Sequence, residues 1–207
     1  MGGTTSDEPP RRSVPSHAPR RPRPPREGCT VDDLFGLAGL PPHTELIDGS
    51  LVFACPQREF HSLAVDLLEH GLRCTVPERF RVRRDMTVVI DRWQAPEPDV
   101  SVVRAEAATG LDLTAYQAAD VVLAVEVVSP DSEKRDRERK PQLYAQAGIR
   151  HFWRLEKGED GRPVVYVYEL DGGTNAYGLA GIHHDRLKLT VPFDIDIDID
   201  LAGIDTL

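Results

Sequence analysis

The sequence lacks the features that mark secreted and membrane-spanning proteins. Its 207 residues contain no apolar run near the roughly eighteen residues needed to cross a bilayer, and its N-terminal region has no apolar signal-peptide stretch. Only three cysteines occur (Cys29, Cys55 and Cys74), an odd number without the paired spacing of a zinc site. We therefore expect free thiols, a cytoplasmic location in a reducing compartment, and no membrane partner.

An excess of positive charge is also missing. The chain has 25 lysines and arginines against 34 aspartates and glutamates, a net charge of −9. Proteins that hold nucleic acid mainly by bulk electrostatics neutralise its phosphates with basic side chains, so the composition argues against that class. A metal-dependent nuclease is still compatible, because there a bound cation meets the phosphate.

Composition divides the chain into a tail and one domain. Residues 1–28 are rich in proline, arginine and serine and show no apolar periodicity. They predict a disordered basic tail, either a solvated leader or an arm that touches nucleic acid. Residues 29–207 are long enough for one domain. Hydrophobic residues make up 40% of the chain, enough to form a core.

Local patterns predict most of the helices and strands. Thr30 and Asp33 resemble a capping box at the start of a short helix. Asp48-Gly49 between residues 44–47 and 50–54 predicts a β-hairpin with a two-residue turn. A helix is expected over residues 58–73, with an apolar face formed by Phe60, Ala64, Leu67, Leu68 and Gly71.

Further apolar runs predict a sheet. Strands are expected over residues 79–90, 100–103, 121–128, 152–155, 164–170 and 193–201, and a helix over residues 131–147. The last run alternates Asp with Ile, which predicts one apolar face and one solvated face. The order of elements indicates an α/β or α+β fold around one mixed sheet.

Two acidic residues are candidates for chemistry. Glu126 stands inside the apolar run 121–128, where a lone carboxylate is unusual, and Asp99 follows Pro98 at the head of the run 100–103. Two carboxylates that converge form a divalent-cation site of the Mg²⁺ type. The alternatives are a turn aspartate and a buried glutamate paired with an arginine.

A lysine on the following helix extends this group. Lys140 shares a helical face with Leu143, Tyr144 and Ala147, so the face that packs on the sheet turns Lys140 inward, towards Glu126. The alternative is a lysine that reaches solvent, and Pro141 favours a kink at this point. His61, early in the helix 58–73, is either a ligand or phosphate contact or a partly buried histidine. Arg81 and Arg83 share one side of a strand. They are either contacts to a phosphate backbone or ordinary surface charges.

These residues form an ordered series with a family resemblance. The series comprises Glu45-Leu46-Ile47-Asp48-Gly49, Pro98-Asp99-Val100-Ser101-Val102-Val103, Val125-Glu126-Val127-Val128-Ser129-Pro130-Asp131-Ser132, Asp136, Lys140, Tyr144, Ala147-Gly148-Ile149 and Phe152-Trp153. Over roughly residues 30–205 it resembles the Uma2 family of restriction-endonuclease-like proteins, within the PD-(D/E)XK nuclease superfamily.

The resemblance implies a restriction-endonuclease-like core, a mixed central sheet flanked by helices, here with an extra β-hairpin and one divalent-metal site. By this resemblance Asp99 and Glu126 match the metal-binding acids, and Glu45 matches an acid that some members supply from an early element. Val128 stands where the simplest nuclease pattern has its lysine. Lys140 matches the lysine that has moved to the following helix, and Tyr144 lies one turn beyond it.

The leading hypothesis is an endonuclease that uses Mg²⁺ or Mn²⁺ to hydrolyse DNA phosphodiester bonds. Asp99 and Glu126 would hold the metal, with Glu45 as a third acid, while Lys140 would orient water or stabilise charge on the phosphate and Tyr144 would support Lys140. One alternative is a catalytically silent binding or assembly module with the nuclease fold. Another is a metal-dependent hydrolase that acts on something other than DNA. A homodimer is expected if both strands of a duplex are cut.

Overall fold

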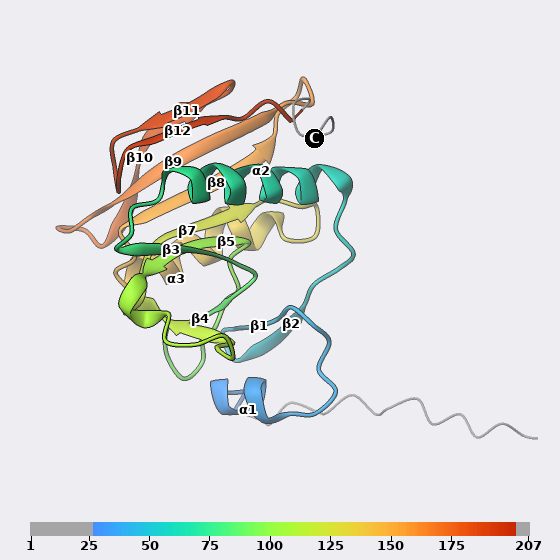
Figure 1. Cartoon of the computed structure of the whole chain (residues 1–207). Coiled ribbons are helices and arrows are strands. Elements are labelled where there is room, and N and C mark those ends of the chain that lie inside the picture. The colour runs from blue at the N-terminus through green and yellow to red at the C-terminus, as the bar shows by residue number, and fades with distance from the viewer. Residues whose placement is uncertain (1–26, 202–207) are drawn as a thin grey trace, which may run out of the picture.

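A six-stranded mixed sheet forms the centre of residues 27–201, the part of the chain that this computed structural model describes (Figure 1). The strand order is β10-β9-β8-β7-β5-β3, and only β7 and β8 are parallel neighbours. The strands are β3 (Phe80–Arg84), β5 (Val100–Arg104), β7 (Val121–Val127), β8 (His151–Lys157), β9 (Pro163–Asp171) and β10 (Ala176–His183). The predicted tail, residues 1–28, lies almost wholly outside the described residues.

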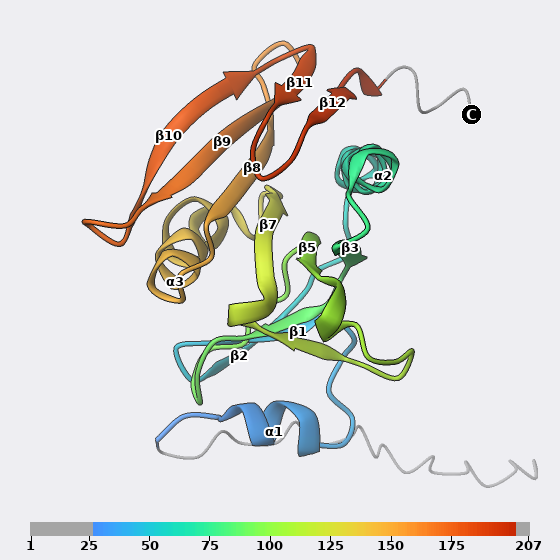
Figure 2. The ribbon, with the colours of Figure 1, turned by 60° about the vertical axis from the view of Figure 1, so that its left-hand side comes forward.

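Both faces of the sheet are covered (Figure 2). Helix α2 (Glu59–Thr75) and the hairpin of β11 (Arg186–Leu189) and β12 (Ile195–Asp198) pack on one face, where Trp153 is buried. Helix α3 (Lys140–Gln146) and the parallel pair of β4 (Thr87–Val89) and β6 (Ala115–Gln117) pack on the other, where Phe152 is buried. Adjacent residues of β8 thus serve opposite cores, because side chains alternate along a strand.

The predicted β-hairpin stands apart from the central sheet. It pairs β1 (Thr44–Ile47) with β2 (Ser50–Phe53) in an antiparallel ladder. Asp48 and Gly49 both have positive φ, 52° and 70°, as a two-residue turn of this type requires. Below it lies the short helix α1 (Val31–Gly36), whose N-terminus carries the capping box of Thr30 and Asp33. The structure therefore has both local features that the sequence predicts here.

The segment predicted as one strand over residues 79–90 is two strands. β3 ends at Arg84, Asp85 takes a left-handed conformation with φ 51°, and β4 begins at Thr87. The chain turns at Asp85 and leaves the central sheet, so β3 pairs with β5 while β4 pairs with β6. Strands β6, β10 and β11 are absent from the sequence prediction, because none has a strong apolar run.

The helix predicted over residues 131–147 contains a π-helical turn, Arg135–Arg139, before α3. The N–H of Lys140 donates to the carbonyl of Arg135, five residues earlier. Pro141 follows directly and has no N–H to donate to the preceding turn, which accounts for the widened turn. Asp136 lies within this turn and Lys140 directly after it, and both side chains are buried.

The remaining sequence expectations concern membranes and thiols. Within residues 27–201, no helix combines the length and the apolar character needed to cross a bilayer. Cys29 is buried, Cys55 and Cys74 are exposed, and all three are free thiols, as the sequence predicts.

Candidate functional site

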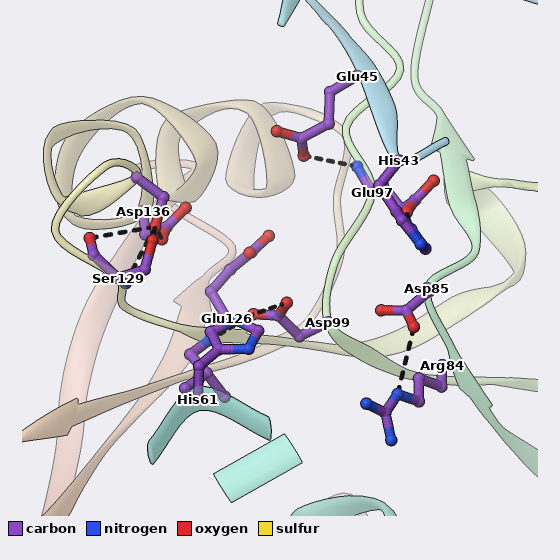
Figure 3. Close-up of polar contacts among 12 residues, drawn as sticks. His43, Glu45, His61, Arg84, Asp85, Glu97, Asp99, Glu126, Ser129 and Asp136 are labelled. Atoms are coloured by element: carbon purple, nitrogen blue, oxygen red, sulfur yellow. Dashed lines mark hydrogen bonds and ion pairs between the residues drawn. The ribbon is translucent and has the colours of Figure 1, made fainter. Parts of the chain in front are cut away.

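Antiparallel pairing explains why Asp99 and Glu126 meet. Val100 of β5 faces Val125 of β7, so the residue before β5 lies beside the last residues of β7. There the backbone N–H of Val127 donates to Oδ2 of Asp99 at 2.6 Å. Asp99 and Glu126 both line one cavity of about 350 Å³ (Figure 3). The two acids therefore share a site although 27 positions separate them in the sequence.

Lys140 enters this cavity from the helix that follows β7. Its Nζ lies 2.8 Å from Oε2 of Glu126 and 2.8 Å from Oε1 of Glu45. It also lies 3.4 Å from Oδ1 of Asp136, one turn earlier. The residue is only 4% exposed, and a buried ammonium is stable only with compensating partners. Here three carboxylates from three elements supply them.

The charges of this group depend on one another. Burial alone lowers the pKa of Lys140, but Glu126, Glu45 and Asp136 outweigh it and leave that pKa well above its usual value. Burial raises the pKa of the Glu126 carboxyl, and the ammonium of Lys140 opposes that rise. The same two effects act on Asp136, whose pKa is also raised. Lys140 therefore stays positively charged, and its charge stabilises the ionised forms of the carboxyls around it.

The hydroxyl of Tyr144 reaches Glu126. It donates a 2.6 Å hydrogen bond to Oε1 of Glu126, whose Oε2 accepts from Lys140, so Tyr144 and Lys140 share one carboxylate. Burial and the nearby charge of Glu126 raise the pKa of Tyr144 well above its ordinary value, which keeps the phenol a donor. Together Lys140 and Tyr144 fix both oxygens of Glu126.

His61 lies in the first turn of α2 and reaches Asp99. Its Nε2 is 3.1 Å from Oδ1 of Asp99, and its side chain is 12% exposed. Asp99 is thus held through one oxygen by His61 and through the other by Val127. The arginines that the sequence offered as phosphate contacts lie elsewhere: Arg83 donates to the hydroxyl of Tyr116, and Arg81 contacts backbone carbonyls beside it. Their neighbour Arg84 lines the cavity instead.

Several cavity residues are absent from the sequence-based site. Asp136 precedes Lys140 by four residues, and its Oδ1 accepts no hydrogen bond from the described residues although it is buried. Ser132 donates to the other oxygen of Asp136 and contacts Ser129 at 2.9 Å. Helical spacing from Lys140 was the signal that could have revealed Asp136. His43, Asp85 and Glu97 also line the cavity, and no local pattern marks them.

The carboxylate oxygens of the site suit a divalent cation. Each oxygen of Asp99 and Glu126 has one polar partner among the described residues, namely His61 and the Val127 N–H for Asp99 and Lys140 and Tyr144 for Glu126, and each oxygen has two lone pairs. Mg²⁺ and Mn²⁺ prefer such hard oxygen ligands. The donor set therefore fits the cation that the family resemblance implies.

Comparison with solved structures supports the fold. A crystal structure from Anabaena variabilis ATCC 29413, described as "a putative nuclease belonging to DUF820", is similar with a TM-score of 0.64 and 19% sequence identity. The match covers 84% of this chain and 97% of that one. At this identity the likeness concerns the fold, a mixed central sheet with few helices. No curated protein gives a significant match.

Comparison with family models identifies the family. The model described as "Uma2: Putative restriction endonuclease" matches residues 31–202, which include every residue of the site described above. A family of nuclease type therefore agrees with the nuclease-like fold, the convergent carboxylates and the buried lysine. The chain belongs to the Uma2 family of restriction-endonuclease-like proteins.

Proposed function

We propose that this protein is an endonuclease that depends on a divalent metal ion and hydrolyses DNA phosphodiester bonds. The observation that carries the proposal is the position of the Lys140 ammonium, 2.8 Å from both Glu45 and Glu126 in a cavity that Asp99 also lines. Acids and a lysine from four separate segments meet there, an arrangement that can hold a metal ion beside a scissile phosphate.

Asp99 and Glu126 would hold the ion, with Glu45 as a further oxygen ligand. A bound Mg²⁺ or Mn²⁺ supplies polarisation of the scissile phosphate and a lowered pKa of the attacking water. His61 and the Val127 N–H keep the Asp99 carboxylate directed into the cavity, and Tyr144 does the same for Glu126. These fixed carboxylates lower the cost of reorganising the site when a cation arrives.

Lys140 would act on the substrate. Its ammonium stays charged and is held at a fixed position by three carboxylates. With a cation on Asp99, Glu126 and Glu45, the adjacent Lys140 ammonium would donate to a phosphate oxygen or orient the attacking water. Donors placed where negative charge builds up are among the largest contributions to catalysis.

A catalytically silent binding module is the second candidate. The observation that favours it is the closed state of Glu126, which is 1% exposed and has Lys140 and Tyr144 on its two oxygens. The net charge of −9 also opposes tight contact with DNA without cations. The pairing of two copies and a cytoplasmic location remain predictions.

Plasmid cleavage with added Mg²⁺ or Mn²⁺ separates the candidates. We expect the wild type to nick or linearise supercoiled DNA, and Glu126→Gln and Lys140→Gln to lose this activity. Glu138→Gln and Lys134→Gln are matched controls, because both residues are exposed on the same helical segment. Cleavage that persists in Glu126→Gln and Lys140→Gln would remove the proposed mechanism, and a folded wild type that cleaves no DNA with either metal would favour the binding module.

A further inference from the structure

A second set of metal-binding side chains lies in the same cavity as the proposed catalytic centre. His43, Asp85 and Glu97 each offer one ligand atom, and these atoms lie within 4.8 Å of one another. Opposite ligands of an octahedral ion bonded at about 2.1 Å are roughly 4.2 Å apart. A small movement of the Glu97 or Asp85 side chain would therefore bring all three ligand atoms within bonding distance of one ion. We propose that His43, Asp85 and Glu97 bind a second divalent cation, of the transition-metal type.

The three residues come from separate segments that the fold brings together. His43 directly precedes β1, Asp85 occupies the turn between β3 and β4, and Glu97 stands two residues before Asp99. His43 Nδ1 lies 2.6 Å from Oε1 of Glu97. Figure 3 shows these side chains grouped on one side of the close-up, with Glu45 and Asp99 drawn between them and Glu126.

Two hydrogen bonds connect this group to Glu45 and Asp99, one to a carboxylate and one to a backbone carbonyl. The backbone N–H of Glu97 donates to Oε1 of Glu45 at 2.8 Å. The backbone N–H of Asp85 donates to the carbonyl of Asp99 at 3.2 Å. The backbone segments that carry Glu45 and Asp99 are therefore bonded directly to those that carry the second group, and the two proposed cation positions share one wall of the cavity.

The charge of the cavity provides an independent argument for a second cation. Among the described residues, its wall contains seven carboxylates and three permanently positive side chains. The carboxylates are Glu45, Asp85, Glu97, Asp99, Glu126, Asp131 and Asp136, and the positive side chains are Arg84, Arg135 and Lys140. If every carboxyl is ionised, the excess is four negative charges, and one divalent cation neutralises only half of it.

The local environment supports the same conclusion. Arg84 contacts Asp85 at 3.2 Å but also pairs with Asp66, which lies outside the cavity wall. His43 is about half exposed, with 53% of its side chain accessible, so an ion from solvent can reach the group.

The ligand types predict a difference in metal preference between the two positions. Asp99, Glu126 and Glu45 offer only oxygens and suit Mg²⁺ or Mn²⁺. The second position adds an imidazole nitrogen, which favours Mn²⁺ or Zn²⁺ over Mg²⁺. Excess Mg²⁺ should therefore displace Mn²⁺ from the first position and leave it bound at the second.

Electron paramagnetic resonance of free Mn²⁺ tests this on the full chain. We expect two Mn²⁺ per wild-type chain without Mg²⁺, and one that resists excess Mg²⁺. His43→Ala and Glu97→Gln should each weaken the Mg²⁺-resistant ion at least about tenfold. His184→Ala, a change at an exposed histidine outside the cavity, is the matched control and should leave binding unchanged.

The outcomes separate this inference from the proposed function. No Mg²⁺-resistant Mn²⁺ in the wild type, or its unchanged retention in His43→Ala, overturns the second position whatever the cleavage assay gives. Retention of that ion in Glu126→Gln, with loss of cleavage, supports both proposals. Retention in Glu126→Gln with no cleavage by the wild type supports the second position alone. Circular dichroism checks folding, and the half-exposed His43 provides the decisive variant if Glu97→Gln does not fold.

Discussion

The backbone N–H of Val127 donates a 2.6 Å hydrogen bond to Oδ2 of Asp99. This contact ties the residue before β5 to the residue after Glu126, across an antiparallel ladder. Asp99 therefore contributes to the stability of the fold as well as having its proposed role as a metal ligand. Two substitutions can separate these contributions.

Asp99→Asn should separate charge from hydrogen bonding. Asparagine keeps an oxygen that can accept from Val127 but loses the negative charge. We expect Mg²⁺-dependent cleavage to fall by more than the roughly 10–100-fold typical of a residue that only hydrogen-bonds to a metal ligand. The free energy of unfolding should stay within about 1 kcal/mol of wild type. Asp99→Ala should cost about 1–3 kcal/mol because the N–H loses its acceptor. Urea denaturation and plasmid cleavage measure both, and equal stability of the two variants would contradict this assignment.

Lys140→Met should be strongly destabilising. It leaves Glu126, Glu45 and Asp136 without their shared cation, and breaking a buried ion pair on one side costs about 3–5 kcal/mol. Glu126→Gln in the same chain should recover part of this loss, because one uncompensated charge disappears. A double-mutant cycle by urea denaturation measures the coupling. The exposed Lys134→Met should change stability by less than about 0.5 kcal/mol, and strict additivity of the Lys140 and Glu126 variants would refute the coupling.

Tyr144→Phe should remove one hydrogen bond to Glu126 without creating a cavity in the core. The ring keeps its contact with Phe152, whose centroid lies 5.9 Å away, but the hydrogen bond to Glu126 is lost. A hydrogen bond to a charged group contributes about 1.5–3 kcal/mol, and we expect a loss of that size. Thermal unfolding followed by calorimetry measures it. A variant as stable as wild type would show that the hydroxyl does not hold the carboxylate.

Gly71→Ala should be destabilising although alanine is the better helix former. A Cβ at position 71 would lie 2.7 Å from the side chain of Ile197 on β12. Overpacking costs about 1–3 kcal/mol, which outweighs the roughly 1 kcal/mol that alanine gains in helix propensity. Adding Ile197→Ala should remove the clash, so that Gly71→Ala becomes neutral or stabilising in that background. Denaturation midpoints of the four chains decide the sign.

His151 should make the fold sensitive to mild acid. Burial lowers its pKa below the ordinary value of about 6.5, so the unfolded chain takes up the proton first. The contribution of His151 to stability is therefore complete above about pH 6.5 and is lost as the pH falls through the folded-state pKa. His151→Gln should lose less stability than wild type between pH 7.5 and 5.5. Urea denaturation at both values measures this, and equal losses would contradict it.

Local chemistry made several elements predictable from sequence. Thr30 and Asp33 cap α1, and Asp48-Gly49 form the turn of the hairpin, because a short segment contains the whole determinant. Alternation of isoleucine and aspartate gave β12 its buried and exposed faces. Strands β10 and β11 were not predicted, because their residues are mostly exposed and show no clear apolar pattern. Each is a strand because it pairs with a neighbour, β10 with β9 and β11 with β12.

The candidate site divides in the same way. Glu126 and Lys140 could be paired from sequence, because a charged residue in a buried strand and another on the next buried helical face need each other. Asp136 lay within the same helical spacing. His43, Asp85 and Glu97 could not be found, since each occupies an irregular segment and only the left-handed turn at Asp85 and the path before Asp99 bring them together.

The sequence was sufficient to determine which residues are costly to bury and where most of the buried helices and strands lie, since these properties depend on side-chain chemistry and spacing within a few turns. Tertiary structure decided which further charges join Glu126 and Lys140 in the cavity, because β5 and β7 run antiparallel and the helix after β7 returns over the sheet. Coulomb interactions act over a few ångströms in space without regard to distance along the chain. That is why Glu45, from the hairpin, stands 2.8 Å from Lys140, 95 positions later.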